Sequence, residues 1–369
     1  MACYFLEELL TRGRVCVLTP EPVSLEDHDR VWGTRLAGSE LEVKVLHSPL
    51  LSLLRRLRVP TVRLEIHLLC RAAKKLRSRF TYCTVIPGEL DLGAPCLQVL
   101  YYPFLSMEQL KGEVRSLKPF WWRLLAHLNI WASQWLHHWQ DSRISESFIV
   151  VISRYIGALV QDVYHSTHNE VLFPPPAALP AVESKDRRMA VLAIGRITRV
   201  KGWTELVSLV DKVRARGHEL GLTIVGFVED PEYHRELELL RKTRADWFRL
   251  RADTSREELT AEIAEHEFGI HIMEGEHYGM GVAEMMLGGC LTLVHDSGGQ
   301  VEIVTEPELR FTDLDDGAEK LSRLLDDPDE RERLKASQCA RRRDYSLEAF
   351  RESFHRCMDA YENWLNVNS

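Results

Sequence analysis

Short apolar runs alternate with longer polar or amphipathic stretches along this chain. The short runs are rich in β-branched and aromatic residues and predict strands, and the stretches between them have the length of helices. In the first half we expect strands at residues 15–19, 42–46, 82–86, 97–101 and 148–152. In the second half we expect strands at residues 190–194, 222–225, 247–250, 268–273 and 291–294. Strands that alternate with helices predict an α/β fold with parallel, doubly wound sheets.

A proline-rich segment separates the two halves. Pro174, Pro175 and Pro176 cannot join a strand ladder, and the residues after them lack periodicity. We therefore expect a first domain at residues 1–173, a linker at 174–186, a second domain at 187–345 and a last helix at 346–369. Ser346 is the expected cap of that helix, and one apolar stripe follows it, formed by Phe350, Phe354, Met358, Tyr361 and Leu365.

Composition excludes several classes of protein. The 369 residues suffice for two domains, and 45% hydrophobic with 28% charged residues is typical of globular proteins. A net charge of −8 argues against a nucleic-acid partner, which would favour a basic surface. Eight scattered cysteines without a C-x-x-C pair predict free thiols in a reducing, cytoplasmic compartment. No apolar run approaches the ~20 residues of a membrane-spanning helix.

Residues 268–304 hold the best candidate site. A short apolar strand leads into a polar turn with two glycines, and an apolar helix follows. The first amides of such a helix, around residues 278–281, have no partner within it and favour an anion such as a diphosphate. Glu276 precedes this helix and Glu284 lies about two turns further on, so the two acids can reach different parts of one ligand.

Two cations form a second candidate feature. Arg196 and Lys201 closely follow a predicted strand, and Gly195 and Gly202 flank them. Together they can hold a diphosphate leaving group and neutralise its charge as it departs. Without the surrounding motif, such a pair is more often a solvated surface.

Both features resemble one family. The E-x7-E spacing from Glu276 to Glu284, the ending Gly298-Gly299-x-x-Glu302, and the G-R-x4-K-G segment from Gly195 to Gly202 resemble the signatures of family 4 retaining glycosyltransferases. Within that family, GIHIMEGEHYGMGVAE and LVHDSGG look most like dolichol-pathway α-1,2-mannosyltransferases. The resemblance covers roughly residues 148–350 and is diffuse before them.

The resemblance implies a GT-B fold, in which two Rossmann-like domains face a cleft and the last helix crosses back to the first domain. It implies transfer of a hexose, with mannose favoured, from a GDP- or UDP-linked donor to a glycan or lipid-linked acceptor, with retention. Its catalytic residues would be Arg196, Lys201 and Glu276. Its donor-binding residues would be Gly195, His271, His277, Tyr278, Gly279, Met280, Gly281, Glu284 and Gly298. We expect no metal or cofactor, because the two cations and the helix start can stabilise the departing anion and no suitable loop holds a D-x-D pair.

The first half matches the family less well. On the acceptor side the resemblance points to Asp91 and to Tyr101, where many relatives have histidine. The first strand and glycine loop of the family are missing before the predicted helix at residues 1–11, so we hypothesise an N-terminally shortened frame or a fragment. In a doubly wound sheet that strand normally lies at the point where ligands bind.

An aromatic segment allows two interpretations. Trp131, Trp135 and Trp139 share one face of a predicted helix, near Trp121 and Trp122. They predict either a peripheral membrane surface that reaches a lipid-linked acceptor or an aromatic core helix.

Single residues, and the function of the whole chain, also allow more than one interpretation. His271, within an apolar strand, suits a satisfied core histidine as well as a site residue. Glu276 suits a loop acid favoured by the helix dipole. For the whole chain, the competing functions are a nucleotide-sugar 2-epimerase and a nucleotide-sugar-binding protein without transfer activity.

Overall fold

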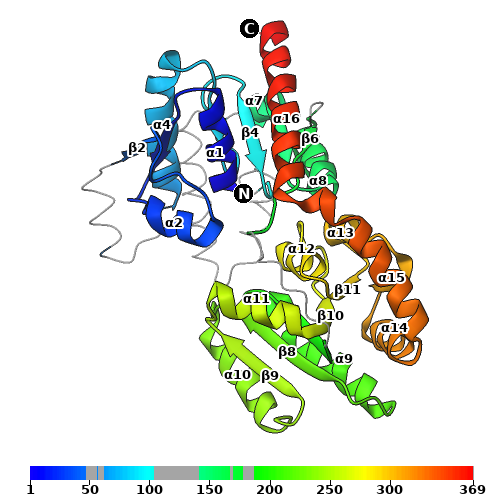
Figure 1. Cartoon of the computed structure of the whole chain (residues 1–369). Coiled ribbons are helices and arrows are strands. Elements are labelled where there is room, and N and C mark those ends of the chain that lie inside the picture. Colours follow the sequence, from blue (N-terminus) through cyan, green and yellow to red (C-terminus); the bar gives the residue numbers. More distant parts are fainter. Residues whose placement is uncertain (47–55, 57–61, 104–140, 167–168, 178–186, 369) are drawn as a thin grey trace, which may run out of the picture. The chain divides into compact units, whose positions relative to one another are not determined.

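The computed structural model describes residues 1–46, 56, 62–103, 141–166, 169–177 and 187–368. The chain divides into two compact units (Figure 1). One comprises Met1–Phe173 with Arg351–Ser369, and the other is Pro174–Phe350. The predicted tryptophan segment lies outside the described residues, as does most of the predicted linker.

The second unit is built on a six-stranded parallel sheet with the order β12-β11-β10-β7-β8-β9. Its central strands are apolar along most of their length, as expected for strands covered on both faces. The strands are β7 (Arg188–Ile194), β8 (Gly221–Gly226), β9 (Phe248–Ala252), β10 (His266–His271), β11 (Leu291–His295) and β12 (Arg310–Phe311).

The strand order reverses between β7 and β10. From β7 the chain adds β8 and β9 on one side, and it then returns to place β10 on the other side of β7. In open α/β sheets, ligands bind at the carboxyl ends of the strands next to such a reversal. This edge of the sheet is therefore where a site is expected.

Helices connect the strands of this unit, and their ends follow the usual capping rules. Ser255 and Glu258 form a capping box, and Asp230 and Asp313 accept amide hydrogen bonds at two other helix starts. The helices are η2 (Arg199–Lys201), α9 (Trp203–Ala215), α10 (Pro231–Lys242), α11 (Arg256–Glu265), α12 (Met280–Leu287), α13 (Gln300–Ile303), η3 (Pro307–Leu309), α14 (Leu314–Asp326), α15 (Pro328–Ala340) and η4 (Arg342–Tyr345).

The first unit contains two parallel sheets within its described residues. One pairs β1 with β2, and the other has the order β3-β4-β5-β6. The strands are β1 (Cys16–Thr19), β2 (Glu42–Val45), β3 (Thr84–Val85), β4 (Leu97–Leu100), β5 (Phe148–Val151) and β6 (Asn169–Val171). The helices are α1 (Ala2–Arg12), α2 (Leu25–Trp32), α4 (Val62–Leu76), η1 (Arg77–Arg79), α7 (Asp141–Ser145) and α8 (Arg154–Tyr164).

From Arg351 on, the last helix, α16 (Leu347–Asn368), belongs to the first unit, and Phe354, Met358 and Tyr361 of its apolar stripe are buried. Ser346 accepts a hydrogen bond from the amide of Ala349, which confirms the predicted cap. Phe354 contacts the ring of Phe5 edge to face, with centroids 4.8 Å apart. At the helix surface Arg12 pairs with Asp359 and Glu362.

All ten predicted strands are present, with boundaries shifted by one or two residues. The prediction missed β6 and β12, which are three and two residues long. The predicted α/β class with parallel sheets is confirmed. Among the described helices, none combines the length and the apolar character needed to span a bilayer.

Candidate functional site

Lys201 and Glu276 meet at the carboxyl edge of the second unit's sheet. Lys201 ends η2, which follows β7, and Glu276 lies in the turn that follows β10. The Lys201 Nζ donates to Oε2 of Glu276 at 2.5 Å. The two side chains are 12% and 15% exposed, so the pair is largely shielded from water but still reachable. Two segments 75 residues apart are thus joined at the strand-order reversal.

His271 completes this cluster from the end of β10. Its Nε2 lies 3.4 Å from the Lys201 Nζ and 3.3 Å from Oε2 of Glu276. Burial and the Lys201 ammonium lower the pKa of His271 to about 4, so the imidazole is neutral at pH 7. Burial alone would raise the pKa of Glu276, but the neighbouring imidazole and ammonium outweigh it and lower that pKa to about 2. At neutral pH the site therefore holds one cation, one anion and a neutral imidazole.

The glycine turn brings the start of α12 to the same place. Gly279 has φ 102°, a left-handed conformation that favours glycine, and no side chain caps the helix there. The first helical hydrogen bond runs from the amide of Ala283 to Gly279, so the amides of Met280, Gly281 and Val282 have no partner within the helix. The Tyr278 ring is buried, so only its backbone is available on the site side.

Gly298 fixes the position of Glu276. It has φ 73°, and a Cβ atom placed there would clash with the carbonyl oxygen of Glu276. The neighbouring Gly299 donates its amide to that carbonyl at 2.7 Å. The loop after β11 thus supports the turn that carries Glu276 through backbone contacts.

Arg196, which is predicted to share a ligand with Lys201, is bonded to another residue in this structure. It follows Gly195 at the end of β7, is 48% exposed in its side chain, and donates to Glu229 at 2.6 Å. It is near enough to His277 to lower the pKa of that imidazole, although burial is the larger cause. Arg196 therefore borders the cluster, but its side chain is bonded outside it.

Glu284 is held by a residue that sequence reasoning missed. Arg256 at the start of α11 donates to Oε1 of Glu284 at 2.6 Å and to the carbonyl of Ala177 at 2.8 Å. Burial raises the pKa of Glu284, and the arginine opposes that rise. The apolar surroundings of Glu284 indicated that it needs a partner, but no local pattern pointed to an arginine 28 positions earlier.

Gln300 is a second missed residue. It begins α13 directly after the two glycines, is fully buried, and its Oε1 lies 2.7 Å from Nδ1 of His271. The available signal was a large polar side chain directly after a glycine pair at the end of a buried strand.

The two acceptor-side candidates lie in the first unit, so they are described apart from this cluster. Asp91 lies between β3 and β4, is buried, and accepts hydrogen bonds from Arg143 at 3.0 and 3.1 Å and from the amide of Gly93. Tyr101 directly follows β4, and burial raises the pKa of its hydroxyl. Both residues are therefore connected to the same sheet of this unit.

The geometry suits an anionic ligand with several hydroxyl groups. A lysine and free helix amides can bind phosphate oxygens, while Glu276 can accept hydrogen bonds from hydroxyl groups once Lys201 turns to the phosphate. The site can therefore neutralise the charge of a phosphate group and, beside it, orient an uncharged group that carries hydroxyls.

Three curated relatives share the stated activity of a GDP-Man:Man(3)GlcNAc(2)-PP-Dol alpha-1,2-mannosyltransferase. The Candida glabrata enzyme is 21% identical over 58% of this chain and 46% of its own length. The Mus musculus enzyme is 28% identical over 31% of this chain and 24% of its own length. The Xenopus laevis enzyme is 25% identical over 44% of this chain and 37% of its own length. This chain thus matches less than half the length of each.

Two solved structures share the fold. A glycosyltransferase from Rickettsia africae ESF-5 superposes with a TM-score of 0.63 at 13% identity, over 98% of this chain and 94% of that one. Anabaena Alr3699/HepE in complex with UDP-glucose gives a TM-score of 0.62 at 12% identity, over 97% of this chain and 94% of that one. These similarities agree with the expected GT-B class of two Rossmann-like units.

The family described as "Glycosyl transferases group 1" matches residues 178–340. That span contains Lys201, Glu276, the α12 start and Gln300, and it covers most of the second unit. The second unit of this chain is a glycosyl transferase group 1 domain.

Proposed function

We propose that this protein is a retaining glycosyltransferase that moves a hexose, with mannose favoured, from a GDP- or UDP-linked donor to a glycan or lipid-linked acceptor. The observation that carries the proposal is the meeting of Lys201, Glu276 and the open start of α12 where the strand order reverses. The relatives named as mannosyltransferases support the choice of sugar.

Lys201 is the proposed partner of the diphosphate. In transfer, the bond between the sugar C1 and the phosphate oxygen breaks, and the diphosphate leaves with the electron pair. The acceptor hydroxyl forms the new bond to C1 and gives its proton to the departing phosphate. An ammonium and helix amides stabilise the negative charge that grows on the leaving group. Arg196 joins them when its side chain turns from Glu229.

Glu276 is the proposed ligand of the sugar hydroxyls. A pKa of about 2 keeps it ionised, so it acts as a hydrogen-bond acceptor at any physiological pH. Glu284 is proposed to bind the ribose, with Arg256 holding it in place. His271 and His277 line the same site, and neither bears a full charge at pH 7, because burial lowers both pKa values.

We propose that catalysis needs no metal or cofactor. The Lys201 ammonium, the Arg196 guanidinium and the α12 amides supply the positive charge that a divalent cation would otherwise bring to the diphosphate.

A cytoplasmic location is proposed from the thiols. All eight cysteines are free, and five of them are in the first unit's main segment. A lipid-linked acceptor would also require contact with a membrane surface, and liposome flotation tests this directly.

The proposal is tested by thermal stabilisation with GDP- and UDP-sugars. We expect one donor class to raise the melting temperature of the wild type and to have no effect on Lys201→Ala. Lys335→Ala is a matched control, because Lys335 also pairs with a buried acid, Glu267, at 2.8 Å on another part of the unit. Stabilisation that survives in Lys201→Ala, or is lost in Lys335→Ala, contradicts the proposed site.

A donor-binding protein without transfer activity is the second candidate. Tyr101, which stands where the family resemblance leads us to expect histidine, favours it, because a phenol hydroxyl does not take up a proton near pH 7 as an imidazole can. Release of free sugar from the stabilising donor distinguishes the two functions, since a binding protein leaves the donor intact.

A further inference from the structure

Gln300 has a fixed amide orientation. Its Nε2 donates to the carbonyl of Met273 at 2.9 Å and to the carbonyl of His295 at 3.0 Å. A carbonyl oxygen only accepts hydrogen bonds, so the amide nitrogen must face these two groups. The amide oxygen therefore faces Nδ1 of His271 at 2.7 Å. The reversed amide would place its oxygen against two carbonyl oxygens in a fully buried position.

This orientation determines which nitrogen of His271 carries the proton. Since Oε1 of Gln300 only accepts, Nδ1 of His271 must be the donor. The imidazole is 2% exposed, and a second proton on Nε2 would lie 3.4 Å from the Lys201 ammonium and 3.3 Å from Oε2 of Glu276. Burial and the ammonium outweigh the carboxylate, so the ring stays neutral at pH 7. Nε2 therefore keeps its lone pair, and that lone pair accepts a hydrogen bond from Lys201.

We propose that Gln300 is a positioning residue that holds His271 in the Nδ1-protonated form, so that His271 Nε2 anchors the Lys201 ammonium. The consequence for transfer rests on the proposed function. When Glu276 turns to the sugar hydroxyls, Lys201 loses one of its two acceptors. His271 then keeps the ammonium at the diphosphate, and it does so only in this tautomer.

The tautomer is measured by long-range proton–nitrogen correlation of ¹⁵N-labelled protein at pH 7, without any ligand. The His271 signals are assigned by their loss in His271→Gln. We expect a protonated Nδ1 in the wild type and an Nε2-protonated or mixed form in Gln300→Leu. An Nε2-protonated wild type, or an unchanged spectrum in Gln300→Leu, overturns the proposal.

His266 is an internal reference in the same spectra. Its Nδ1 lies 2.6 Å from the carbonyl of Glu262, and its Nε2 lies 2.9 Å from the hydroxyl of Thr223. It should show a protonated Nδ1 in every variant. A His266 signal that moves together with that of His271 means general unfolding rather than loss of the Gln300 contact, and the readout then passes to Gln300→Glu.

Gln300→Glu keeps an acceptor for Nδ1, but it also replaces the amide donor with a carboxyl oxygen that faces the carbonyls of Met273 and His295. It is therefore compared with the wild type by its tautomer and not by its stability. We expect it to retain the wild-type tautomer, and an Nε2-protonated His271 in this variant overturns the proposal. For transfer, we expect Gln300→Leu to lower kcat roughly tenfold with little change in KM, the scale on which an orienting partner acts, and Gln300→Glu to restore part of it. Unchanged kcat in a folded Gln300→Leu with an altered tautomer overturns the role in transfer.

The two proposals fail separately. Should no nucleotide-sugar bind while the tautomer is as expected, the proposed function fails and the positioning of Lys201 stands. If a donor binds and reacts while His271 is protonated at Nε2, the proposed function stands and the positioning of Lys201 by His271 fails.

Discussion

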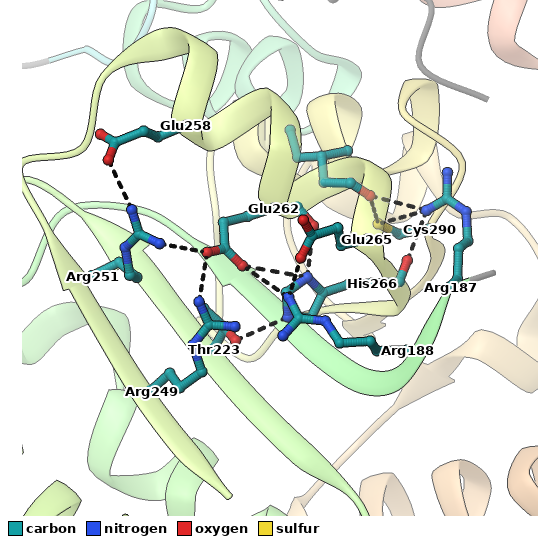
Figure 2. Close-up of polar contacts among 11 residues, drawn as sticks. Arg187, Arg188, Thr223, Arg249, Arg251, Glu258, Glu262, Glu265, His266 and Cys290 are labelled. Atoms are coloured by element: carbon teal, nitrogen blue, oxygen red, sulfur yellow. Dashed lines mark hydrogen bonds and ion pairs between the residues drawn. The ribbon is translucent and has the colours of Figure 1, made fainter. Parts of the chain in front are cut away.

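Two acids of the second unit, Glu262 and Glu276, each lie beside a buried histidine, and they differ in the number of cations that they face. Figure 2 shows Glu262 on α11 above strands β7 to β9, where Arg188, Arg249 and Arg251 converge on its carboxylate at 3.3, 2.9 and 2.8 Å. His266, beside it, has both ring nitrogens bonded within the protein. Burial lowers the pKa of His266 to about 4, the same value as for His271.

At the carboxyl edge, Glu276 faces one lysine where Glu262 faces three arginines. In the Glu262 cluster, defined by Glu262 with Arg188, Arg249 and Arg251, both carboxylate oxygens already accept hydrogen bonds from arginines, and the acid itself is 5% exposed. The Lys201–Glu276 pair has three ammonium protons, two carboxylate oxygens and the neighbouring α12 amides, which exceed the contacts it makes internally. Perturbed pKa values occur in both places, so the unfilled bonding capacity is what distinguishes a site from a structural network.

The largest expected effect tests the structural side of this comparison. Glu262→Gln should lower the free energy of unfolding by about 3 kcal/mol, near the lower end for breaking a buried pair, because its arginines are one-third or more exposed. Glu276→Gln should cost about 1 kcal/mol or less, since it removes only one ion pair. Urea denaturation measures both, and equal losses would remove the distinction.

The next largest effect is on the rate of transfer. Here a substitution at the Lys201–Glu276 pair should matter more than one in the Glu262 cluster. Lys201→Ala should lower kcat/KM at least about a hundredfold, the usual result of removing one group that stabilises a leaving anion. Arg249→Ala, from the Glu262 cluster, should change kcat/KM less than about twofold despite its lower stability. A comparable kinetic loss in Arg249→Ala argues that the cluster is part of the site.

Acid should destabilise both regions through their histidines. The folded pKa of His266 is about 4 and its unfolded value is about 6.5, so its contribution to stability is complete above pH 6.5 and is lost as the pH falls to 4. We expect the free energy of unfolding to decline across this window, and less steeply in His266→Gln. A variant with the wild-type slope would mean that His266 is already charged in the folded protein.

His271 should lose its contribution to stability over the same pH range, from 6.5 to 4, whereas the neighbouring Glu276 titrates at lower pH. Glu276 keeps a folded pKa of about 2 against about 4.5 unfolded, so its own contribution is present above pH 4.5 and disappears only as the pH falls through 2. The decline between pH 6.5 and about 5, above the range in which Glu276 titrates, should therefore be reduced in His271→Gln and nearly unchanged in Glu276→Gln.

The smallest expected effect is that of removing divalent metal ions, which should leave the rate of transfer almost unchanged. Excess EDTA should leave transfer by the purified protein within about twofold of the untreated rate, because the proposed charge stabilisation comes from side chains and helix amides. A strict requirement for added magnesium would place the diphosphate on a metal instead.

The sequence was sufficient for the strands and for the turn that carries Glu276. Long apolar runs such as β8 and β10 need no partner to be recognised, whereas β6 and β12 are too short to carry a pattern. The meeting of Lys201 with Glu276 follows from parallel strands whose carboxyl ends share one edge.

The missed partners share a physical reason. Arg256 lies 28 positions before Glu284, and Gln300 lies 29 positions after His271. Such contacts depend on the angle at which a helix packs on the sheet, and periodicity does not encode that angle. The bond from Arg196 to Glu229, after the neighbouring strand, is a contact of the same kind, and the shared role of Arg196 and Lys201 on a diphosphate stays a prediction.

Arg256 has one consequence beyond its hold on Glu284. Its other hydrogen bond goes to Ala177, three residues after Pro174, where the chain enters the second unit. The same guanidinium therefore anchors the incoming chain and the acid on α12. A displacement of the backbone at Ala177 would therefore move Arg256, and with it the carboxylate of Glu284.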